Sequence, residues 1–115
     1  AAALMIGYVL TAAVSLTGAN AFVGNGMEGL YIMTTGAVSL SQVSADDNTG
    51  DGVYIAGAAG LTLTCGSMTH NGGWGLYVTT WSGLLKLIGV VASGNTAGDI
   101  FPDPATFWTV VRACP

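Results

Sequence analysis

Charge is the property that this sequence has least of. Two basic and six acidic residues among 115 make up 7% of the chain and leave a net charge of −4. An ordinary soluble domain is about 25% charged. Nucleic acids and anionic membranes are bound through clusters of Lys and Arg. We therefore expect no nucleic-acid partner, and a surface too poorly charged to stay solvated as a monomer.

Long hydrophobic helices are missing as well. Residues 1–16 are apolar, but they number fewer than the roughly 20 that a membrane helix needs. They also include Gly7 and lack the basic residues with which a signal peptide begins. No 3.6-residue apolar stripe appears elsewhere, so we expect neither membrane insertion nor helices. The start at Ala-Ala-Ala without Met favours a processed product. That product is a mature extracellular or cell-surface protein, or a fragment of a larger one.

Residues that carry catalysis are few. His70 is the single histidine, and no second His, nearby Cys or suitably placed Ser completes a catalytic triad or a zinc site. Glycine pairs such as Gly72-Gly73 lack the Lys and the following helix of a phosphate-binding loop. We therefore predict a protein that is not an enzyme and that uses no cofactor.

Cysteine occurs only twice, at Cys65 and Cys114. An even pair in a secreted chain often forms a disulfide, and the alternative is two unpaired buried thiols. The repeat described next places about two coils between these cysteines. A disulfide within one chain would therefore require the C-terminal tail to fold back, and a disulfide between subunits is the other geometry.

What the sequence does contain is an internal repeat. Three segments share the order Asn, three variable residues, Gly, hydrophobic, Tyr, hydrophobic, and a fourth has drifted. The asparagines that begin them follow one another at spacings of 23, 23 and 24: Asn25, Asn48, Asn71 and Asn95. An aromatic residue follows each Asn by six positions, and Tyr8 extends the series backward by 23: Tyr8, Tyr31, Tyr54, Tyr77 and Phe101.

Two further apolar patterns recur with the same period. The first alternates hydrophobic residues with Ser, Thr or Lys, at 14–16, 38–40, 61–63, 85–87 and 108–110. The second is suggested by Val43 with Ala45 and by Val90 with Ala92. Alternation with a period of two indicates strands with one buried face. Each copy therefore contains three short strands separated by turns rich in Gly, Asn, Asp and Ser.

A repeating unit of this kind cannot bury its apolar face alone, but successive units can stack so that equivalent strands pair in parallel. We predict an all-β, single-domain right-handed parallel β-helix of about four to five coils, with residues 1–98 as coils and 99–115 as a last partial coil or C-terminal cap. The four repeated asparagines would form a ladder of amide hydrogen bonds. The glycine four residues after each Asn would supply the unusual backbone angles of a corner.

Two coils depart from the period. The third carries one extra residue around Trp81-Ser82-Gly83, which we place in a bulging turn. If Tyr8 is aligned with Tyr31, the first coil has one residue fewer between Tyr8 and Val14 and one more between Leu16 and Asn25.

This organisation resembles the right-handed parallel β-helix repeat family, the pectate-lyase-like solenoids of bacterial and archaeal surface or exported proteins. The resemblance covers about residues 6–101. It implies the fold but no single function, because the same fold carries lyases, hydrolases, adhesins and fibres. For enzymes of the family it implies a Ca²⁺ cluster with an Arg base, or a pair of Asp residues.

The acidic residues give a weak match to such a site. The repeat places Glu28 one rung from Asp51, in the turn that also contains Asp46 and Asp47, and four carboxylates are able to bind Ca²⁺. The alternative is a solvated acidic turn, and no Arg or Lys lies in the same coil. His70 aligns with Asp47 one coil earlier, either as a charge-assisted pair or as an exposed turn residue.

The aromatic register is the more informative feature. Because their neighbours alternate inward, the rings of Tyr8, Tyr31, Tyr54, Tyr77 and Phe101 should point outward as a stripe along one face. An apolar stripe of this kind marks an assembly or ligand face. Burial against a neighbouring subunit and stacking on a sugar are both consistent with it, and the scarcity of charge favours the neighbour.

The ends of the solenoid indicate the function. An unprotected strand edge recruits another chain, and the first coil, residues 1–16, has no charge and no capping helix. We therefore expect an extracellular structural protein that polymerises by stacking subunits into a filament or surface layer. The alternatives are a carbohydrate-binding or polysaccharide-degrading β-helix, and a piece of a larger adhesin. An ice-binding array from Ser39, Ser41, Thr62 and Thr64 is weaker, because Lys86 and Ile88 interrupt it.

Overall fold

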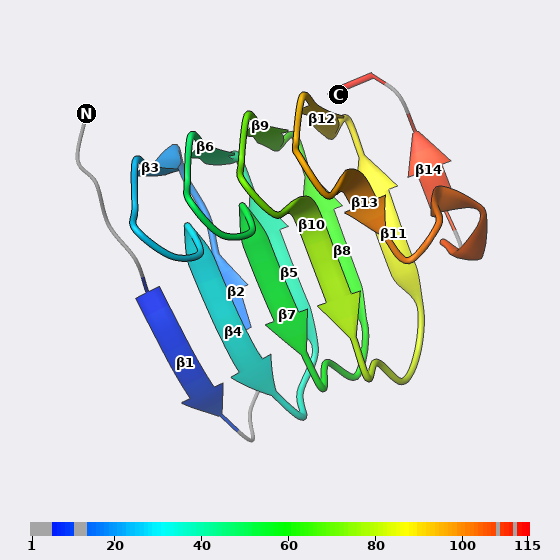
Figure 1. The fold of residues 1–115 in the computed structure, drawn as a ribbon. Helices are drawn as coiled ribbons and strands as arrows, with labels where there is room; N and C mark the ends of the chain where they lie inside the picture. The colour runs from blue at the N-terminus through cyan, green and yellow to red at the C-terminus, as the bar shows by residue number, and fades with distance from the viewer. Residues whose placement is uncertain (1–5, 11–13, 108, 112) are drawn as a thin grey trace.

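A computed structural model of the chain describes residues 6–10, 14–107, 109–111 and 113–115. These residues form fourteen strands and one short 3₁₀ helix, and the strands stack as a parallel β-solenoid of about four turns (Figure 1). In Figure 1 the coils advance from β1 at the left to β14 at the right, in the right-handed sense. The predicted all-β parallel solenoid is confirmed.

Each coil contributes strands to three parallel sheets. Sheet A contains β1 (Ile6–Leu10), β4 (Leu30–Thr34), β7 (Val53–Ala56), β10 (Trp74–Thr79) and β13 (Gly98–Phe101). Sheet B contains β2 (Val14–Leu16), β5 (Val38–Ser41), β8 (Leu61–Thr64), β11 (Leu85–Ile88) and β14 (Thr109–Val111). Sheet C contains β3 (Asn20–Val23), β6 (Val43–Asp46), β9 (Ser67–Thr69) and β12 (Val91–Ser93). The 3₁₀ helix η1 (Pro104–Thr106) lies between β13 and β14.

The alternation in the sequence explains why these segments are strands around one core. In β7 and β8 the apolar residues are buried and the residues between them are half-buried. The register places Leu30, Val53 and Leu76 beside one another in successive coils, and all three are fully buried. Sheets B and C contribute equivalent apolar columns, so that one continuous core runs through the coils.

The register of the first coil corrects the sequence alignment. In sheet A, Gly7 pairs with Tyr31 and Tyr8 pairs with Ile32, so the backbone position of Tyr8 is not in the column of the other aromatic residues. The side chain of Tyr8 lies outside the described residues. The cause is an insertion after β2, because the turn from Leu16 to Asn20 is one residue longer than its counterpart in the next coil. The expected deletion before Val14 is therefore wrong.

The bulge expected in the third coil is present. The sequence offset between paired residues grows by one between Thr79, which lies opposite Ala56, and Leu85, which lies opposite Leu61. The additional residue lies in the intervening turn, where the Ser82 N–H donates to the Ala58 carbonyl. Later copies of the repeat, including Asn95, are shifted by this one residue without loss of pairing.

The glycines that follow the ladder asparagines serve a different purpose from the one we expected. Gly29, Gly52 and Gly75 do not have positive φ angles, so they do not supply special corner geometry. Space is the reason instead, because a Cβ on Gly52 would lie 2.6 Å from the Gly75 carbonyl oxygen and 2.7 Å from the Asn71 amide nitrogen. In the last coil this position is Asp99, which is exposed.

Gly52→Ala is expected to lower the free energy of unfolding by about 2 kcal/mol, because the methyl group forces two coils apart. Gly26→Ala is the matched control, since nothing lies within 4 Å of its Cβ position and its φ is not positive. Urea unfolding followed by circular dichroism measures both. Equal stability of the two variants would contradict the close approach of coils at Gly52.

No helix among the described residues is long and apolar enough to cross a membrane.

After β13 the chain passes through η1 and returns to sheet B as β14, which pairs with β11. Phe107, in this connection, is buried against the end of the core.

Candidate functional site

A ladder of asparagine amides ties the coils together at one corner. The Asn25 Nδ2 donates to Asn48 Oδ1 (3.0 Å), Asn48 Nδ2 to Asn71 Oδ1 (2.9 Å), and Asn71 Nδ2 to Asn95 Oδ1 (2.8 Å). Each accepting oxygen also receives the backbone N–H of the preceding Asn. At the C-terminal end Asn95 Nδ2 donates to Asp99 Oδ1 (3.1 Å), so a carboxylate closes the ladder within the chain.

The aromatic residues of sheet A form a second ladder on the outside. Ring centroids are 4.8 Å apart for Tyr31 and Tyr54, 5.4 Å for Tyr54 and Tyr77, and 4.9 Å for Tyr77 and Phe101, and the planes are within 12° of parallel. The ring of Trp74 contacts the rings of Tyr77 and Phe101, with its plane tilted relative to both. Burial, and then the neighbouring tyrosines, raise the pKa of Tyr54. The rings cover one another's faces and present their edges outward.

The four carboxylates proposed as Ca²⁺ ligands are not brought together. Asp46 Oδ1 accepts hydrogen bonds from the hydroxyls of Ser67 and Thr69 and from the Thr69 N–H. Asp51 Oδ1 accepts the Trp74 N–H at 2.6 Å, one coil further on. Within residues 6–10, 14–107, 109–111 and 113–115, no group of three or more His, Cys, Asp and Glu side chains is placed to hold a metal ion.

Asp51 and Glu28 are nevertheless neighbours. Burial raises the pKa of the Asp51 carboxyl, the hydrogen bond from Trp74 lowers it, and the charge of Glu28 raises it further. Both lie just before the strands that hold the aromatic ladder: the Gly29 N–H donates to the Asp51 carbonyl, and the Asp51 carboxylate accepts the N–H of Trp74, whose ring contacts Tyr77. The arrangement gives the aromatic face one acidic edge.

Asp47 and His70 occupy equivalent corners of successive coils, each with a positive φ. The His70 ring contacts the following coil, where a Cβ on Gly94 would lie 3.1 Å from its Cδ2 atom. Between these two described residues there is no ion pair or hydrogen bond. His70 is therefore an exposed corner residue rather than half of a charged pair.

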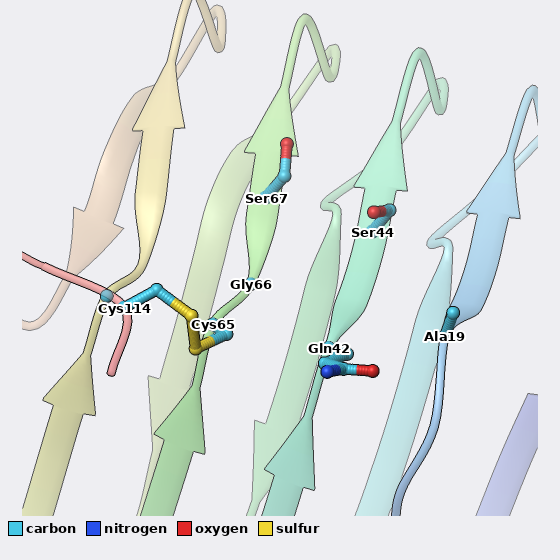
Figure 2. A pocket seen from close by; sticks show the side chains of 8 residues that line it. Ala19, Gln42, Ser44, Cys65, Gly66, Ser67 and Cys114 are labelled. Carbon is cyan, nitrogen blue, oxygen red and sulfur yellow. A yellow bond between two sulfur atoms is a disulfide. The ribbon is translucent and has the colours of Figure 1, made fainter.

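A disulfide joins Cys65 to Cys114 within the chain, with Cα atoms 5.2 Å apart (Figure 2). The tail folds back to reach it, and Cys114 lies against Gly89, where a Cβ would be 2.5 Å from the Cys114 Cα. An open hollow of about 370 Å³ lies beside the disulfide, at the corner between sheets B and C. Ser44, Ser67 and Gln42 supply its polar groups, and no acid or base lines it.

The C-terminal end of the core opens to solvent. Val110 pairs with Leu87 and continues the Leu40–Leu63–Leu87 column, yet it is 50% exposed, because β14 is the last strand of sheet B among the described residues. An apolar hollow of about 380 Å³ lies here, lined by Leu87, Val90, Val91, Ala92, Ile100, Pro104, Val110 and Val111. The repeat predicted the bare end at the first coil and not at β14, although the position of Val110 in the Leu40–Leu63–Leu87 column follows from the same repeat.

The structure thus combines an amide ladder, an aromatic ladder and an apolar hollow at the C-terminal end of the core. Comparison of the chain with protein-family models, with curated proteins and with solved structures found no match.

Proposed function

We propose that this protein is an extracellular structural protein whose subunits stack end to end into a filament or surface layer. The observation that carries the proposal is the apolar hollow at the C-terminal end of the core, which is lined by Val110, Val111 and Val91, each about half exposed. Exposed apolar hollows mark interaction sites. The last described strands of the three sheets, β12, β13 and β14, also have no further strand on their outer edges, and such edges recruit another chain.

A second copy supplies what this end lacks. Every coil pairs in parallel with the next, so strands of the first coil of one copy are suited to pair with the last coil of another in the same geometry. Such a contact joins two different surfaces and therefore propagates instead of closing. Because only 7% of the residues are charged, few charges lose their water when two copies meet. The disulfide supports an oxidising, extracellular compartment.

Val110→Asp is expected to abolish end-to-end assembly, because it places a charge in the apolar hollow. Sedimentation velocity at neutral pH should show polymers of the natural chain and a much smaller species for the variant. Val91→Asp, at a residue that is 57% exposed, tests the same surface independently. Ser39→Asp, on the exposed outer face of sheet B, is the control for the added charge. Equal assembly of Val110→Asp, Val91→Asp and Ser39→Asp would contradict the proposal.

Polysaccharide binding at the aromatic face is the second candidate. It is favoured by the row of phenol hydroxyls beside Glu28 and Asp51, because sugars are bound through such polar groups. The covered ring faces count against it, since stacking on a sugar needs an open face. Retention of the natural chain on immobilised polysaccharide, lost in a Tyr31→Ala, Tyr54→Ala double variant, would support this candidate. No retention would dismiss it.

A further inference from the structure

The outer face of sheet A is organised in three columns that run along the solenoid. The central column is the aromatic ladder, from Tyr31 to Phe101. On the side nearer the strand starts, Glu28, Asp51 and Trp74 follow one another in successive coils, because the Gly29 N–H donates to the Asp51 carbonyl and the Gly52 N–H to the Trp74 carbonyl. On the other side are Met33, Ala56 and Thr79, which pair in register. Met33 is 40% exposed. The face therefore has an acidic edge, an aromatic centre and a largely apolar opposite edge.

The orientation of the rings limits what this face is able to bind. Aromatic faces are electron-rich and attract cations and sugar C–H groups, whereas ring edges carry partial positive charge. In the ladder the faces of Tyr54 and Tyr77 are covered on both sides by neighbouring rings. What remains outward is a row of ring edges and hydroxyls, spaced by the 4.8–5.4 Å between ring centroids.

A second copy of this chain matches that row in both chemistry and spacing. A phenol hydroxyl is donor and acceptor at once, so identical rows of hydroxyls are able to hydrogen-bond to each other. Parallel strands repeat at about 4.8 Å in every such solenoid, so the two rows stay in step over several coils. A basic partner is a poorer match, because cations bind to ring faces and these are covered. The only groups that attract it are the carboxylates along one edge of the face.

The columns also select the relative orientation of the two copies. If the two-fold axis runs along the solenoid, the Glu28–Asp51 column of one copy faces the Met33–Ala56 column of the other. If the two-fold axis runs along the strands instead, the carboxylate columns face each other and repel. The first arrangement leaves both copies with the same polarity.

We propose that the aromatic face is a lateral interface at which two copies of this chain pair with their solenoid axes parallel. The hydroxyl rows of Tyr31, Tyr54 and Tyr77 meet across the two-fold axis, and the half-buried acidic edge of each copy lies at the rim of the interface, next to the Met33–Ala56 edge of the other copy, where its carboxylates stay in contact with water. This interface is separate from the open core end, so it forms whether or not subunits also stack end to end.

The test uses the Val110→Asp chain, in which end-to-end stacking is blocked, and measures its mass by sedimentation equilibrium. We expect a concentration-dependent dimer. Tyr54→Ser should weaken the dimer at least about tenfold, as for a residue at an interface centre. Tyr54→Phe keeps the ring stack and removes only the hydroxyl, so it should weaken the dimer by a smaller factor. A monomer at tens of micromolar, or a dimer unchanged by both substitutions, would overturn the proposal.

Met33→Lys tests the orientation. In the parallel pair the new ammonium group faces the partner's Glu28, and the dimer should tighten about threefold. Ser39→Lys on sheet B changes the net charge equally without touching the face, and should tighten the dimer less. Weakening by Met33→Lys would exclude the parallel pairing, because it would mean that lysines face each other. If the natural chain is also a dimer and forms nothing larger, the proposed end-to-end stacking is wrong and the lateral interface is not affected.

Discussion

Asn71→Ala is expected to lower the free energy of unfolding by about 4 kcal/mol, a large part of the stability of an ordinary domain. Asn71 is 1% exposed and lies in the middle of the amide ladder. Its Oδ1 accepts the backbone N–H and the amide of Asn48, and its Nδ2 donates to the Ala45 carbonyl and to Asn95 Oδ1. Alanine removes these partners together.

The size of the effect follows from the groups that are left behind. A buried donor or acceptor without a partner costs about 1–3 kcal/mol, and Asn48 and Ala45 would each be left with such groups. Asn95→Ala should cost less, because Asn95 is half-buried and stands at the end of the ladder. Thr96→Ala, at an exposed neighbour, is the control.

Urea unfolding of the three variants measures the gradient. The order Asn71, Asn95, Thr96 in decreasing cost is the expected result. A loss below about 1 kcal/mol at Asn71 would mean that the ladder contributes no more than an ordinary exposed hydrogen bond.

Removal of the disulfide should destabilise the chain by a similar amount. Cys65 and Cys114 are 49 residues apart in sequence, and a cross-link across a loop of that length restricts the unfolded chain by about 4 kcal/mol at room temperature in the chain-entropy account. The disulfide also holds the tail against Gly89, whose N–H donates to the Val111 carbonyl in β14. Its loss is therefore expected to loosen β14 before the central coils.

The double variant Cys65→Ala, Cys114→Ala should melt at a lower temperature than the natural chain and should not respond to dithiothreitol, whereas the natural chain should respond. Hydrogen exchange then separates local from global effects: amides of β14 should lose protection first, and those of β7 and β8 last. Uniform loss of protection across all strands would contradict a disulfide that acts on the tail.

Loosening of β14 has a consequence for assembly. Val110 and Val111 line the apolar hollow at the open end of the core, and both belong to β14. Reduction of the natural chain should therefore shorten its polymers under the proposed end-to-end stacking.

The sequence predicted correctly which residues lie in the same column wherever the repeat keeps its period. It did not predict the register where the period changes. Alternation at Leu30, Ile32, Val53 and Ile55 predicted buried strand faces, because inward residues in equivalent strands must all be apolar. Tyr8 was misplaced because its equal spacing from Tyr31 was read as an equal coil length, and an insertion after Leu16 shifts the register by one. The extra residue between Leu16 and Asn25 is visible in the sequence, but spacing alone does not show that no deletion before Val14 compensates for it.

Contacts between coils were harder to predict than contacts within them. The glycine at position 52 looked like a corner residue, but its role is to let the Gly75 carbonyl and the Asn71 amide approach. The same holds for the tail. The sequence indicated Cys114 as a candidate disulfide partner and residues 108–110 as a last apolar run. It did not indicate that both return to the corner at Gly89, because that return depends on the path of the chain through η1. The exposed end of the core at Val110 follows from that path.

X-ray fibre diffraction from aligned polymers of the natural chain is the most direct test of the proposed assembly. End-to-end stacking continues the solenoid from one subunit to the next, so strands lie across the filament and a reflection near about 4.8 Å should appear along its axis. Val110→Asp should give no filaments to align. A natural chain that stays monomeric at tens of micromolar, or filaments whose strand-spacing reflection lies perpendicular to their axis, would contradict the account.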